Sequence, residues 1–89
     1  MINIRRYKKV KIMKLTNAIA IRVKNLLKER NLSQYYLYKF GGVSRSTVSD
    51  VINNKKKRVS TETIYQICST LGLTLSEFFN DPIFDELDD

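Results

Sequence analysis

The side chains with the clearest chemistry in this sequence are four adjacent cations, Lys55 to Arg58. Neighbouring positive charges repel one another and are too strongly hydrated to be buried, so this segment must face water or an anion. Residues that commonly carry catalysis or bind metal are scarce, because the chain has no histidine and a single cysteine, Cys68. A Cys/His zinc site and an internal disulfide are excluded, and the commonest general base is missing. We expect anion binding, with no enzyme activity, no catalytic residue, no metal and no cofactor.

The distribution of charge divides the chain into three parts. Residues 1–15 contain six basic side chains and no acidic one, residues 16–80 contain ten basic and four acidic, and residues 81–89 contain five acidic and no basic. A net charge of +7 favours a polyanionic partner, because each phosphate neutralised by Lys or Arg releases condensed counterions. The predicted organisation is a basic N-terminal arm over 1–15, a folded domain over 16–80 and an acidic C-terminal tail over 81–89.

Length and composition allow one small globular domain. A chain of 89 residues has room for a single core, and a hydrophobic content of 43% with only 3 Gly and 1 Pro is typical of a folded protein. No apolar run of about 18 residues is present, so no membrane span is expected. The basic N-terminus lacks the apolar stretch of a secretory signal, which predicts a cytoplasmic protein.

Apolar residues recur at helical spacing in five segments, which predicts a compact all-α bundle of five short helices. The helices are expected over residues 16–30, 34–40, 45–53, 60–71 and 74–79. Residues suited to capping or to a left-handed backbone lie at the predicted boundaries: Thr16, Ser33, Ser44 and the Thr74–Glu77 capping box at the starts, and Asn31, Gly41-Gly42 and Gly72 at the ends.

The same spacing separates the expected core from the expected surface. In the first helix Ile19, Val23, Leu26 and Leu27 face the core, which leaves Arg22, Lys24, Lys28 and Glu29 for the solvent face. Cys68 lies on the apolar face of the fourth helix and is interpreted as a small hydrophobic residue. After Asp81-Pro82 the apolar residues Ile83, Phe84 and Leu87 are isolated, so we expect the acidic tail to be docked only in part.

The segment from Gln34 to Asn53 carries the functional signal. Two helices of about eight residues joined by a short glycine turn leave the second helix protruding, and such a helix fits the DNA major groove. The segment resembles the helix-turn-helix of the lambda-repressor-like family, of the Cro or XRE type, and the resemblance extends over about residues 16–80. The matching elements are Leu32-Ser33-Gln34, Gly42-Val43-Ser44, Arg45-Ser46-Thr47-Val48-Ser49, Ser60 to Ile64, Leu71-Gly72-Leu73 and Leu75 to Phe79.

The resemblance implies which residues contact double-stranded DNA. Base edges are assigned to Arg45, Ser46, Ser49 and Asp50, with Arg45 matched to guanine because its forked guanidinium fits the two major-groove acceptors. Backbone phosphates, which fix position without reading sequence, are assigned to the remaining polar residues. These are Gln34, Ser44, Asn53, Lys55, Lys56, Lys57 and Arg58.

Two residues depart from the family pattern. The fifth residue of the unit is usually small, because the two helices approach closely there, but here it is Tyr38. Asp50 puts a carboxylate on the recognition helix, where it would repel phosphate but can accept a hydrogen bond from cytosine or orient Arg45. Tyr35, Tyr36 and Tyr38 are interpreted as half-buried packing residues rather than a stacking platform, because consecutive helix positions point in different directions.

The leading functional interpretation is a small sequence-specific transcriptional regulator, acting as a repressor and binding DNA as a homodimer. One alternative is the antitoxin of a toxin–antitoxin pair, which represses its own gene and also binds a protein toxin. Another is a protein–protein adaptor that keeps the fold without DNA binding, although the basic flank of the third helix disfavours it.

The two ends of the chain leave further alternatives open. Leu75, Phe78, Phe79 and Phe84 form either a dimer interface or part of the domain's own core. The acidic tail is a solvated terminus, a phosphate mimic on the protein's own basic face, or a contact for another protein. The basic arm contacts phosphate, pairs as a strand through residues 10–12, or is an extension upstream of an alternative start at Met13, with phosphate contact the favoured reading.

Overall fold

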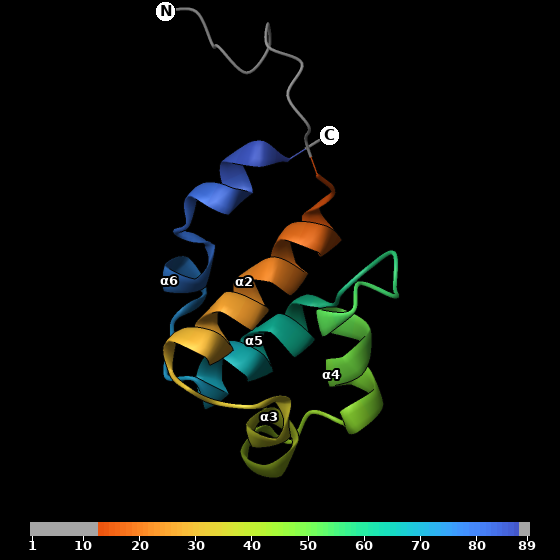
Figure 1. Cartoon of the computed structure of the whole chain (residues 1–89), viewed down its shortest axis with the longest axis vertical. Coiled ribbons are helices and arrows are strands. Elements are labelled where there is room, and N and C mark those ends of the chain that lie inside the picture. The colour runs from red at the N-terminus through yellow and green to blue at the C-terminus, as the bar shows by residue number, and fades with distance from the viewer. Residues whose placement is uncertain (1–12, 88–89) are drawn as a thin grey trace, which may run out of the picture.

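The computed structural model describes residues 13–87, which form six short helical elements (Figure 1). Five α-helices are followed by a short 3-10 helix, which confirms the prediction of an all-α fold. The elements are α2 (Leu15–Glu29), α3 (Gln34–Gly41), α4 (Arg45–Ile52), α5 (Thr61–Thr70), α6 (Leu75–Phe79) and η1 (Pro82–Glu86). In Figure 1, α2 and α5 occupy the middle of the bundle, with α4 on one side and α6 on the opposite side.

Local sequence explains most of the helix boundaries. The Ser44 hydroxyl accepts the Thr47 N–H at the start of α4, and Thr74 and Glu77 form the predicted capping box at the start of α6. Asn31 follows α2 with a φ of 57°, as expected for a residue that ends a helix. The first boundary was predicted wrongly: α2 begins at Leu15, so Thr16 lies inside the helix and Lys14 occupies the N-cap position without a side-chain cap.

The turn between α3 and α4 depends on two glycines with different roles. Gly42 has a φ of 69°, in the left-handed region where a side chain is strained. Gly41 is helical, and a Cβ there would collide with the hydroxyl of Thr70, so it permits close packing of α3 on α5. The sequence predicted the backbone freedom of this turn, but it did not predict that Gly41 packs against α5.

The core lies between α2, α3, α4 and α5, and α6 adds Phe78 to it. Its largest fully buried side chains are Ile19, Val23, Leu37, Val48, Ile67, Cys68 and Phe78. Burial raises the pKa of the Cys68 thiol, while the positive charge of Arg22 opposes this rise. Cys68 is thus kept as a small neutral core residue, as predicted. None of the helices within residues 13–87 has the length and apolar character needed to cross a bilayer.

The segment after α6 is docked in part, as the sequence predicted: within residues 81–87 the side chains are half-buried or exposed, and none is fully buried. Residues Pro82–Glu86 form η1, and Phe84 packs against the core with its ring centroid 5.9 Å from that of Phe78 and 4.9 Å from that of Phe79. The Met13 N–H donates to the Glu86 carbonyl at 3.0 Å, and Met13 forms an isolated parallel bridge with Leu87. Tertiary contacts therefore hold a segment whose apolar residues show no helical period.

Arg22 also contributes to this docking, and its predicted solvent-facing position was wrong. Its side chain is only 11% exposed. It donates to the carbonyls of Glu77 and Phe78 at 3.0 and 2.8 Å and to the Asp81 carboxylate at 3.1 Å. One arginine of α2 thus fixes both the end of α6 and the start of η1.

Candidate nucleic-acid interface

The N-terminal end of α4 is presented to solvent while its opposite face is buried. Ser44, Arg45 and Ser46 are exposed, whereas Val48 and Val51 are in the core. The spacing of valines at a helical period fixes this orientation, because burying both of them turns the first-turn polar residues outward. The predicted base-contacting end of the helix is therefore accessible.

Arg45 is placed by an aromatic ring from the preceding helix. Its guanidinium carbon lies over the ring of Tyr38, 5.1 Å from the ring centroid. Tyr38 is half-buried and packs against the core, so the bulky residue at this position is accommodated by turning its ring toward the start of α4. The sequence marked Tyr38 only as a departure from a pattern and missed its contact with Arg45.

The serines near Arg45 form a small hydrogen-bonded group. The Ser44 hydroxyl accepts the Thr47 N–H at 3.2 Å, donates to the Thr47 hydroxyl at 2.8 Å and lies 3.3 Å from the Ser46 hydroxyl. Further along the helix, the Asn53 amide donates to the Ser49 hydroxyl at 3.1 Å. These contacts hold the polar side chains of α4 in a defined arrangement. All of the hydrogen-bond partners belong to α4 or to its two capping residues.

Asp50 pairs with the basic loop rather than with Arg45. One Asp50 carboxylate oxygen lies 3.8 Å from the Lys56 ammonium, and the Lys55 N–H donates to the Asp50 carbonyl at 2.9 Å. The pair is partly exposed, with side-chain exposures of 29% and 66%, so its contribution to stability is small. Its main effect is to reduce the net charge at Lys56.

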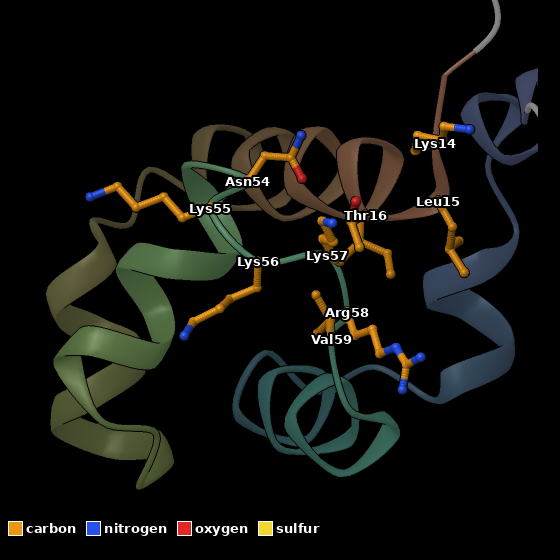
Figure 2. Close-up of a pocket in the computed structure, with 10 residues that line it drawn as sticks. Lys14, Leu15, Thr16, Asn54, Lys55, Lys56, Lys57, Arg58 and Val59 are labelled. Carbon is orange, nitrogen blue, oxygen red and sulfur yellow. The ribbon is translucent and has the colours of Figure 1, made fainter.

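The predicted loop of four cations follows α4 on the same side of the bundle (Figure 1). Lys55, Lys56, Lys57 and Arg58 are all exposed. Figure 2 shows Lys55, Lys56 and Arg58 extending in different directions from the loop. Cations spread in this way can meet several phosphates along a nucleic-acid backbone instead of one point charge.

The basic loop and the start of α2 enclose a hollow of about 720 Å³ (Figure 2). Lys14, Leu15 and Thr16 line it from the α2 side, above an apolar floor that includes Ile19. Lys14 was predicted as part of the N-terminal arm, and the structure adds it to the edge of the loop. Only the tertiary packing brings these distant segments together, so spacing in the sequence carried no signal for it. Residues 1–12 of the predicted arm lie outside the described part of the chain.

Gln34 is the first residue of α3 and lies away from the lining of the first hollow. It is half-buried and lines a second hollow, of about 510 Å³, together with Lys24, Tyr35 and Tyr38. A cation lies over each of these two tyrosine rings. The Lys39 ammonium is 5.8 Å from the Tyr35 ring centroid, and the Arg45 guanidinium lies over the Tyr38 ring. Gln34 is therefore close to the Tyr38 ring on which Arg45 rests. No cluster of His, Cys, Asp and Glu able to hold a metal ion occurs within residues 13–87.

The fold and the exposed end of α4 define a helix-turn-helix DNA-binding domain. The family model of the Cro/C1-type HTH DNA-binding domain matches residues 22–82, more than half of the chain, and the protein belongs to this family. Its fold is similar to a solved structure described as the crystal structure of the prophage Lp1 protein 11. That similarity has a TM-score of 0.74 at 25% sequence identity, and covers 85% of this chain and 100% of the other. No curated protein is similar enough in sequence to count as a relative.

The family assignment confirms the predicted class of function. The protein is a DNA-binding transcription regulator of this family. The matched residues include α3, the glycine turn, α4, the basic loop and α6. The predicted fold and the predicted DNA-binding function are therefore supported by the same part of the chain.

Proposed function

We propose that the protein is a sequence-specific repressor that inserts α4 into the major groove and blocks transcription by occupying its site. The observation that carries this proposal is the exposed first turn of α4, where Arg45 stands free of the core beside the Ser44 and Ser46 hydroxyls. A guanidinium fork pairs with the O6 and N7 acceptors of guanine in that groove. Ser46, Ser49 and Asp50 then read or exclude neighbouring bases.

The flanking residues hold the DNA backbone in this proposal. Gln34, Ser44 and Asn53 are polar residues at the ends of α3 and α4, and the loop from Lys55 to Arg58 adds a positive surface that reaches Lys14. Phosphate contacts of this kind fix the register of α4 on the duplex without reading sequence. The basic arm ahead of Met13 would continue the contact along the backbone.

We further propose that two copies bind together through the face of α6. Leu75 and Phe79 remain 40% and 39% exposed, although Phe78 between them is fully buried. In Figure 1, α6 lies on the side opposite α4, so contact between copies there leaves both recognition helices free. A two-fold dimer would bind a palindromic site whose half-sites are separated by a whole number of helical turns.

The salt dependence of DNA binding tests the phosphate contacts. Log affinity falls as log salt rises, and replacing Lys55 or Lys57 by alanine is expected to make this slope shallower by about one for each residue. Each replacement should also weaken binding to all duplexes equally. Fluorescence anisotropy on one selected and one shuffled duplex measures both effects. Lys28→Ala, in the last turn of α2 at the end far from the loop, is the matched control and should leave the slope unchanged. An unchanged slope in both loop variants would remove the loop from the interface.

The repressor assignment needs a transcription measurement. On a template with a selected site overlapping the promoter, the wild-type protein should reduce run-off transcription at concentrations that saturate the site. Arg45→Ala should not do so at the same concentration. An increase in transcription from that template would contradict repression while leaving DNA binding intact.

A further inference from the structure

The contact between Tyr38 and Arg45 links α3 and α4 at the residue that we propose reads a base. A cation within about 6 Å of an aromatic centroid is attracted by the ring quadrupole. The Arg45 guanidinium carbon is 5.1 Å from the Tyr38 centroid, well inside that range. Arg45 is otherwise exposed at the first position of α4, where a long side chain has many accessible rotamers.

The Tyr38 ring is itself held in place. It is half-buried against the core, and the Tyr35 ring packs edge-on against it with centroids 6.1 Å apart and an interplanar angle of 88°. The Lys39 ammonium lies over the Tyr35 ring, 5.8 Å from its centroid, although Tyr35 is 52% exposed and not half-buried as predicted. Arg45 therefore rests on a supported surface and not on a freely rotating side chain.

We propose that Tyr38 is a positioning residue that determines base specificity by fixing the conformation of Arg45. A guanidinium placed over a ring keeps its N–H donors at its edges, where they remain free to form a forked pair with a guanine. The entropy lost by ordering Arg45 is then spent in the free protein and not on binding DNA. This inference rests on the proposed function, because it requires Arg45 to read a base.

The test compares Tyr38→Phe with Tyr38→Leu on a selected duplex and on duplexes altered at the base pair that Arg45 reads. Phenylalanine keeps the ring and should retain discrimination within about twofold of wild type. Leucine removes the ring and should reduce discrimination at that base pair about two- to fivefold, with binding to a shuffled duplex unchanged. Thermal unfolding identifies the temperature at which both variants are folded, and Tyr38→Met replaces the leucine variant if leucine prevents folding.

A double-mutant cycle separates positioning from a merely structural role. In an Arg45→Ala background, removing the Tyr38 ring should cause no further loss of discrimination, since its partner is gone. A loss of equal size in both backgrounds would overturn the inference and assign Tyr38 to packing. If Arg45→Ala relaxes specificity but Tyr38→Leu does not, the inference fails and the proposed function stands. If the wild type selects no duplex at all, the proposed function itself fails.

Discussion

Replacing Arg22 by methionine is expected to lower the free energy of unfolding by about 2–4 kcal/mol. Methionine keeps most of the side-chain volume, so the loss measures polar contacts and not a cavity. It leaves the carbonyls of Glu77 and Phe78 and the carboxylate of Asp81 without the guanidinium, which donates to all three. Urea unfolding monitored by circular dichroism measures the change.

Two controls isolate the cause of this destabilisation. Lys28→Met changes the same kind of charge on an exposed position of the same helix and should change stability by less than about 0.5 kcal/mol. Asp81→Asn removes the charge of the ion pair and leaves one acceptor oxygen for two donors, Arg22 and the Ile83 N–H that the carboxylate caps at the start of η1. Because the Asp81 side chain is 29% exposed, this change should cost about 1 kcal/mol, less than Arg22→Met. An Arg22→Met variant no less stable than Lys28→Met would show that Arg22 does not hold α6 and η1.

Replacing Arg45 by alanine is expected to cost about 1–3 kcal/mol of binding free energy at one base pair of the selected site. The physical reason is the loss of two parallel hydrogen bonds to guanine, which alanine cannot replace. Binding to a shuffled duplex should change little, because one exposed cation of many is lost. Competition of the selected duplex against single-base variants, measured for both proteins, locates the affected base pair.

Modified bases provide an independent check on this contact. Substituting 7-deazaguanine at the affected position removes the N7 acceptor from the major groove and leaves the minor groove unchanged. Wild-type affinity should fall, while the affinity of Arg45→Ala should not change further. Lys57→Ala is the contrasting variant, since loss of a phosphate contact weakens every sequence to the same degree. An Arg45→Ala loss that is uniform over all sequences would make Arg45 a phosphate contact.

Local features of the sequence predicted much of the fold because they act over a few residues. Helical spacing identified the buried Ile19, Val23, Leu26 and Leu27 of α2, and the Thr74–Glu77 capping box and Gly42 identified a helix start and a turn. Each depends on nearest neighbours along the chain. The loop of cations was predicted from its own charge, whereas the base contacts at the first turn of α4 were implied by the resemblance to the helix-turn-helix family.

Contacts between distant segments could not be predicted in this way. Arg22 occupies an apparently solvent-facing position of α2, and only the arrival of α6 and Asp81 gives it buried partners. The contact of Arg45 with Tyr38 depends on the angle at which α3 and α4 cross, which residue spacing does not specify. Lys14 reaches the basic loop for the same kind of reason, through the packing of α2.

The most direct test of sequence reading by α4 is selection of binding sites from a randomised duplex pool by the wild-type protein. We predict enrichment of a palindromic site bound at least about 10³-fold more tightly than a shuffled duplex at physiological salt. Footprinting should place protection in the major groove of each half-site. A pool without enrichment, bound only through a weak and steeply salt-dependent background, would contradict sequence-specific recognition by this protein.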